Sequence, residues 1–167
     1  MSQSMPLDAS NARGLAVLRI SVGALFLLFG QYKVFGTGFT LGGGLQFWIN
    51  KFLDGSAAYP FMAPVLRDFV LPHGTAIAFL VAYGEFAIGL SLVLGFWVRW
   101  ASAGGVLYML LLIFASNYPG AQAPFWQYFG ASTSHSVFAL CFVAFLVGDS
   151  ERLWSIATLR KARMTSA

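Results

Sequence analysis

Glu85 is a carboxylic acid in the middle of an apolar segment, and this position makes it the strongest candidate in the sequence for a functional residue. The segment 75–98 contains no other charged residue. At about 1.5 Å per residue, such a length crosses a hydrocarbon layer of about 30 Å. A charge at the bilayer centre costs on the order of 2.5–3.5 kcal/mol on insertion scales, so it usually faces a partner or a hydrated cavity. Glu85 could therefore bind a polar ligand, pass a proton or simply hold two helices together.

The apolar segment 14–35 supplies two candidate partners, Arg19 and Lys33. Their spacing, with two glycines between them, places both cations on one stripe of a helix, which must then face protein rather than lipid. We favour Arg19 as the partner of Glu85, because a guanidinium stays charged and binds a carboxylate through two hydrogen bonds. Lys33 competes for the same carboxylate. The Glu85–Arg19 pair is thus the predicted catalytic centre, and a purely structural ion pair is the alternative.

A second set of polar side chains lies near the ends of the apolar segments on the side opposite to Arg19. It consists of Gln31, Lys33, His73, Asn117, Tyr118 and His135. These groups could line a vestibule above Glu85 that binds an anionic substrate, and histidines there would exchange protons near neutral pH. Alternatively, each is an interfacial residue that contacts headgroups and water. No His/Cys pair has the spacing of metal ligands, so we predict no metal site.

The composition places these residues in a membrane. Hydrophobic residues make up 58% of the 167 residues and charged residues 10%, against about 25% charged residues in a soluble domain. No charged residue occurs between Arg99 and Asp149. The lipid bilayer is therefore the first partner, and nothing suggests nucleic acid. Cys141 is the single cysteine, so dithiol chemistry would have to come from a partner protein.

The apolar pattern predicts an all-α fold, an integral membrane four-helix bundle in a single domain, 1–167. The spans are expected at about 14–35, 75–98, 100–116 and 130–148. Two short amphipathic helices between 36 and 73 should lie in the membrane interface or cap the bundle. The remainder, 149–167, reads as a basic amphipathic tail.

The basic residues predict the orientation. One side of the membrane receives Arg13, Arg99, Arg152, Arg160, Lys161 and Arg163, with Arg19 just inside the same end, and the other receives Lys33, Lys51 and Arg67. By the positive-inside rule both termini are cytoplasmic and the first loop is outside, in the inner (plasma) membrane of a cell. We treat the first segment as a retained helix, because its apolar part is longer than that of a signal peptide.

Two stretches resemble the DoxX-like family, including the DoxD-type small subunit of thiosulfate:quinone oxidoreductases. They are LAVLRISVGALFLLFGQYKVFG and LVAYGEFAIGLSLVLGFWVRWASAGG. Shared features are an early arginine (Arg19), a G-x-x-K ending (Gly30, Lys33) and an acid followed by glycine and arginine (Glu85, Gly89, Arg99). The resemblance covers about 14–116, and the ending GDSERLW departs from it. It implies a four-helix inner-membrane protein, associated in some members with thiol or sulfur oxidation coupled to quinone.

Three functions follow from the residues and the resemblance together. The first is a membrane subunit of an oxidoreductase system, with quinone as the candidate cofactor and a second redox subunit or periplasmic protein as partner. The second is a non-catalytic membrane protein that assembles or anchors others. The third is a carrier of a small molecule. An oligomer is compatible with all three.

Overall fold

The computed structural model describes residues 6–130, 133–148, 150–151 and 153–156. These residues form helices joined by loops, and no strand occurs among them. The long helices are α1 (Pro6–Phe35), α5 (Gly74–Leu94), α6 (Val98–Ser116) and α8 (Thr133–Val147). Shorter ones are α2 (Thr37–Thr40), α3 (Gly44–Asp54), α4 (Met62–Val65), the π-helix η1 (Leu66–Val70) and α7 (Gln127–Gly130). The all-α membrane fold is therefore confirmed.

Three helices of the described chain are long and apolar enough to cross a membrane: 10–35, 74–94 and 98–116. The first begins earlier than predicted, because α1 continues back to Pro6. The fourth predicted span corresponds to α8, which has 15 residues. At about 1.5 Å per residue it measures roughly 22 Å, less than the hydrocarbon thickness of about 30 Å. Residues 131–132, 149, 152 and 157–167 of the predicted fourth span and tail lie outside the described residues.

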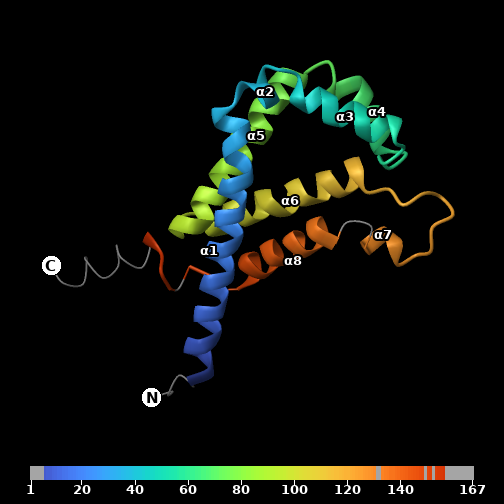
Figure 1. The fold of residues 1–167 in the computed structure, drawn as a ribbon. Coiled ribbons are helices and arrows are strands. Elements are labelled where there is room, and N and C mark those ends of the chain that lie inside the picture. Colours follow the sequence, from blue (N-terminus) through green and yellow to red (C-terminus); the bar gives the residue numbers. More distant parts are fainter. Residues whose placement is uncertain (1–5, 131–132, 149, 152, 157–167) are drawn as a thin grey trace.

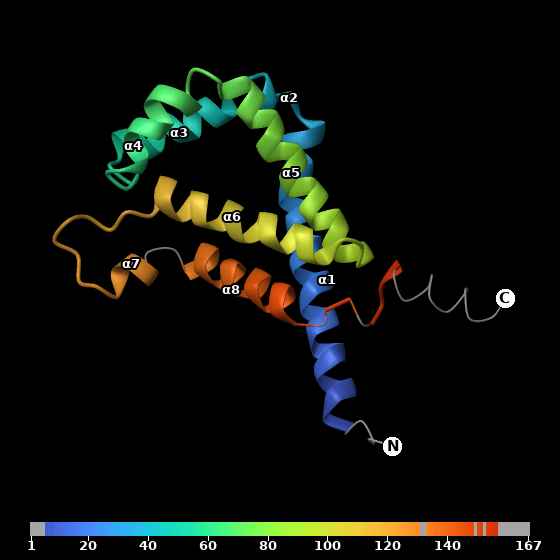
Figure 2. The ribbon, with the colours of Figure 1, turned by 180° about the vertical axis from the view of Figure 1, so that it is seen from behind.

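The long helices associate as two pairs (Figure 1). Helix α5 packs along α1, and α8 packs along α6. In both views the α6–α8 pair runs across α1 rather than beside it, as Figure 2 shows from behind. The two pairs meet where α5 contacts α6 and α1 contacts α8. A shared core forms there, consisting of Val22, Phe26, Leu92, Val98, Met109, Phe142 and Phe145.

Two glycines set the contact between α1 and α5. A Cβ atom on Gly23 would lie 2.8 Å from the Cβ of Leu92 and 2.9 Å from the carbonyl oxygen of Gly89. A Cβ on Gly89 would lie 2.9 Å from the backbone nitrogen of Leu27. Small residues allow such close backbone approach between membrane helices. This crossing therefore fixes which residues of α1 face which residues of α5.

The first loop folds as a cap over the end of the bundle where α1 ends and α5 begins. The helices predicted between 36 and 73 are present as α3 and as α4 followed by η1. Leu45 and Ile49 of α3 are buried against Ala78 of α5 and Ala115 of α6. Two backbone hydrogen bonds tie the loop to the end of α6: Tyr59 N–H to the carbonyl of Phe114 (2.9 Å) and Tyr118 N–H to the carbonyl of Ala57 (2.8 Å).

Candidate functional site

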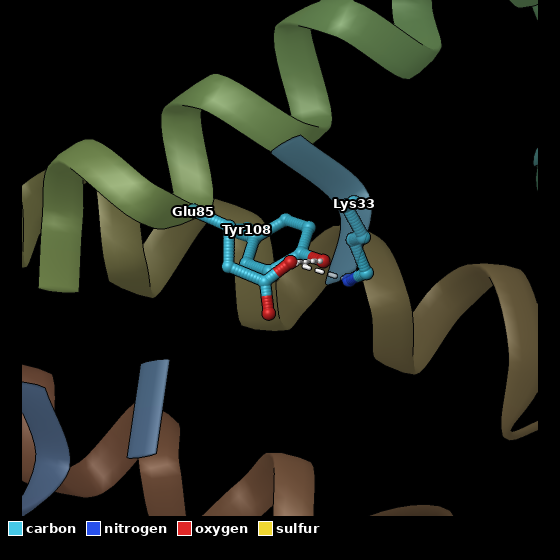
Figure 3. A network of polar contacts seen from close by, with 3 residues as sticks. All are labelled: Lys33, Glu85 and Tyr108. Atoms are coloured by element: carbon cyan, nitrogen blue, oxygen red, sulfur yellow. Dashed lines mark hydrogen bonds and ion pairs between the residues drawn. The ribbon is translucent and has the colours of Figure 1, made fainter. Parts of the chain in front are cut away.

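Lys33 and Glu85 form an ion pair between α1 and α5, in which the Lys33 ammonium group donates to Glu85 Oε2 (Figure 3). Lys33 lies in the last turn of α1 and Glu85 near the middle of α5. The side chain of Glu85 is 8% exposed and that of Lys33 is 24% exposed. The buried acid predicted from the sequence thus has a cationic partner, and it is the lysine.

The predicted pairing of Glu85 with Arg19 is wrong. The two Nη atoms of Arg19 donate to the carbonyl oxygens of Ser150 and Trp154, each at 2.7 Å, and the residue is 0% exposed. The reason is the register of two antiparallel helices. Arg19 lies beside Gly95, ten residues after Glu85 and about 15 Å along the helix axis. The same register brings the end of α1 to the level of Glu85.

Tyr108 of α6 is a third member of the cluster, and sequence reasoning missed it. Its hydroxyl group donates to Glu85 Oε2 at 3.3 Å. Figure 3 shows the phenol and the ammonium group approaching the same carboxylate from two different helices. A signal was available, because a phenol inside an apolar span needs an acceptor and Glu85 is the only carboxylate within the predicted spans.

An aromatic ring of the first loop packs against the ion pair. The Lys33 ammonium group lies 5.3 Å from the centre of the Phe39 ring, which belongs to α2. The Phe39 ring and the burial of Glu85 lower the local dielectric constant, which strengthens the hydrogen bonds within the Lys33–Glu85–Tyr108 cluster.

The predicted vestibule divides into separate groups. Asn117 and His135 are brought together, with 2.8 Å between Asn117 Oδ1 and His135 Nδ1. His73 instead contacts the carbonyl of Phe69 at 2.8 Å on the exposed surface, and Tyr118 packs against Tyr59 at 5.1 Å between ring centres. Gln31 is partly exposed on α1. Lys33 is engaged with Glu85, so this set does not gather around one position.

No group of three or more His, Cys, Asp or Glu side chains with the geometry of a metal site occurs in the described part of the chain. Two polar atoms near the opposite end of the bundle are buried without a hydrogen-bond partner in the structure: Arg19 Nε and Ser102 Oγ.

No curated protein and no solved structure matches this chain. A family model does match: that of DoxX, over residues 14–117, which is more than half of the 167 residues. The match includes Lys33, Glu85 and Tyr108, the three residues of the buried cluster. DoxX is a membrane family often linked to oxidoreductase-associated subunits. This chain is therefore a member of the DoxX family.

Proposed function

We propose that the protein is a membrane subunit of an oxidoreductase system that passes electrons from a thiol or another sulfur compound to quinone. A second redox subunit or a periplasmic protein would supply the electrons. The observation that carries the proposal is the buried Lys33–Glu85–Tyr108 cluster, assembled from three helices. A protonatable acid beside two hydrogen-bond donors suits a reaction that transfers protons with electrons.

Each residue of the cluster has a distinct role in this proposal. Lys33 has further N–H donors besides the one used by Glu85, and it donates a hydrogen bond to a carbonyl oxygen of the quinone head group. Tyr108 turns its single O–H from Glu85 to the same oxygen, and Glu85 holds and delivers protons. The Phe39 ring, which lies against the Lys33 ammonium group, supplies an apolar wall for a planar head group. Bound quinone would supply the capacity to accept two electrons. The donor groups and the Phe39 ring suit such a ligand.

The proton balance depends on the sulfur donor. Oxidation of two thiols to a disulfide releases two electrons and two protons. The electrons and the protons all go to quinone, which becomes quinol. Oxidation of two thiosulfate ions to tetrathionate releases two electrons only, so the two protons come from water. Glu85 is the residue that would relay them. Because Cys141 is the single cysteine, the disulfide forms on the partner or between donor molecules.

Arg19 has a different role from the one expected of it. Since its guanidinium group binds backbone carbonyls after α8, we assign it to positioning of that segment. Lys33 takes its place beside Glu85. Lys33 is also neutralised by Glu85, so attraction of an anion is a weaker part of its role than donation of hydrogen bonds.

The test is quinone reduction by the purified protein with its co-purifying partners, using thiosulfate or a thiol as the donor. Glu85→Gln should abolish reduction. Asp68→Asn is the matched control, because Asp68 is an exposed acid of the first loop and its loss should leave the rate unchanged. Equal rates in both variants, or no reduction with any donor, would contradict the proposal.

A non-catalytic assembly role is the second candidate, and the same ion pair favours it, because it joins α1 to α5. Exchange of the two residues, Lys33→Glu with Glu85→Lys, separates the two functions. It restores the ion pair but moves the acid to another helix. Recovery of co-purifying partners without recovery of quinone reduction would assign the cluster to catalysis. Recovery of the full cellular phenotype would assign it to assembly.

A further inference from the structure

We propose that the Lys33–Glu85–Tyr108 cluster exchanges protons and polar ligands with one side of the membrane only, the side on which α2 and α3 lie. We call this the cap end, and we call the end formed by the α5–α6 turn and residues 150–151 and 153–156 the closed end. The inference deepens the proposed function and rests on it for its chemical purpose. Its test measures access directly and needs no redox activity, so the two proposals can fail separately.

Within the ion pair, Lys33 is the more accessible residue. This residue lies two positions before the end of α1, and Gly36 alone separates α1 from α2. The Lys33 side chain is three times as exposed as that of Glu85, 24% against 8%. The Lys33 ammonium group lies 5.3 Å from the centre of the Phe39 ring of α2, which places it at the cap end. A polar ligand or a proton therefore reaches Glu85 past Lys33, beside the edge of α2.

Between α1 and α5, passage toward the closed end is blocked by backbone contact. Gly89 lies one helical turn from Glu85, and a Cβ atom there would already lie 3.0 Å from the carbonyl oxygen of Gly23. One turn further, Leu92 is 0% exposed and lies against Gly23. A gap smaller than a methyl group holds no water between these helices.

On the side of α6 and α8, passage is blocked by an aromatic layer consisting of Phe26, Phe138, Phe142 and Phe145. Phe26 packs edge to face on Phe138 at 5.8 Å and on Phe142 at 5.2 Å, and it also contacts the Tyr108 ring at 6.4 Å. Phe142 and Phe145 are 0% exposed. A Cβ on Gly105 would lie 2.4 Å from the Phe142 ring, so the ring rests on the α6 backbone. Such packing offers no polar atom along which water could bridge.

Arg19 stands on the far side of this layer. Its bonds to Ser150 and Trp154 hold the chain after α8 against Gly95 at the α5–α6 turn. A guanidinium keeps its proton at all physiological pH values, so it cannot relay protons. A fixed positive charge also repels cations, as arginine does in channels that exclude protons. Packing and charge thus oppose access from the closed end.

One-sided access has a consequence for the proposed reaction. The protons that Glu85 delivers come from the compartment at the cap end, which is the extracytoplasmic side in the predicted orientation. If the sulfur donor is oxidised on that same side, turnover moves no net charge across the membrane.

The test is labelling of single cysteines with a membrane-impermeant thiol reagent, applied from each side in right-side-out and inside-out vesicles. All variants carry Cys141→Ala. Tyr108→Cys reports on the cluster and leaves the ion pair intact. Ser102→Cys is nearly isosteric and reports on the buried region beyond the aromatic layer. Exposed positions at the two ends, Lys51→Cys and Arg99→Cys, identify the sides.

We expect Tyr108→Cys to react with reagent applied from the same side as Lys51→Cys. It should not react with reagent applied from the side of Arg99→Cys. Ser102→Cys should react from neither side. Reaction of either buried position from the Arg99 side would overturn the inference, and so would protection of Tyr108→Cys from both sides. Lys33→Cys combined with Glu85→Gln repeats the measurement without a lone buried charge, should the Tyr108 variant fail to fold.

Discussion

Lys33 and Glu85 join α1 to α5 through an ion pair whose acid is buried and whose base reaches the surface. The two residues are 52 positions apart in the chain, so the pair closes the long first loop. Removing one charge leaves the other without its partner in a low-dielectric region. Removing both avoids that penalty.

We therefore expect Glu85→Gln to destabilise the protein by about 3 kcal/mol, the lower end of the range for a broken buried pair, because Lys33 is partly exposed. The double variant Lys33→Met with Glu85→Gln should recover a large part of that loss. Unfolding in detergent measures both. A double variant less stable than Glu85→Gln alone would contradict the explanation.

Tyr108→Phe removes one hydrogen bond at 3.3 Å and keeps the ring. Loss of a typical hydrogen bond costs about 0.5–1.5 kcal/mol. If Tyr108 also binds the quinone, the KM for quinone should rise while kcat changes little. Tyr83→Phe, at a side chain 52% exposed on α5, is the control and should change neither quantity.

Gly89→Ala places a methyl group 2.9 Å from the Leu27 nitrogen. Overpacking of this kind costs about 1–3 kcal/mol, and it should push α1 away from α5. Gly84→Ala is the matched control on the same helix, because nothing lies within 4 Å of its added Cβ. We expect Gly84→Ala to preserve or raise the unfolding temperature, since alanine favours a helix. Equal stabilities of the two variants would argue against close packing at Gly89.

Arg19→Met removes both bonds to the carbonyls of Ser150 and Trp154. Hydrogen exchange at the described amides after α8 should then accelerate, because the segment loses its attachment to α1. The Lys33–Glu85 pair should be unaffected, so quinone reduction should continue. Arg13→Met, at an exposed position of the same helix, is expected to leave the exchange unchanged. Loss of quinone reduction in Arg19→Met would contradict this positioning role and would show that Arg19 takes part in catalysis.

Tyr59, which joins the first loop to α6, makes the stability of the protein depend on pH in the alkaline range. Burial, reinforced by the neighbouring Tyr128 and Tyr118, raises the pKa of Tyr59 above that of an ordinary tyrosine. Between the ordinary pKa of about 10 and the raised pKa, the folded protein binds more protons than the unfolded chain, so stability falls as pH rises. The stability that the raised pKa of Tyr59 contributes is fully present below the ordinary pKa.

The measurement is the unfolding temperature across that alkaline window. Tyr59→Phe should lose less stability there than the unmodified protein. Tyr32→Phe, whose side chain is 74% exposed, leaves Tyr59 in place and should retain the full alkaline loss. If the two variants show the same profile, another group is responsible for it.

The sequence by itself determined the class of fold and the position of the buried acid. A backbone inside a bilayer must satisfy its hydrogen bonds within each segment, so long apolar stretches become helices. Three of the four predicted spans accordingly coincide with α1, α5 and α6 within a few residues at most boundaries. The isolation of Glu85 among apolar residues also implied a partner before any contact was known.

The choice of that partner was decided by tertiary structure. Arg19 and Lys33 share one stripe of α1, so helical periodicity cannot distinguish them. The contact between Gly23 and Gly89 fixes the register, which brings Lys33 to Glu85 and Arg19 to Gly95. Tyr108 joins only because α6 crosses at that level. Register and crossing depend on how two surfaces fit together, and a single helix does not contain that information.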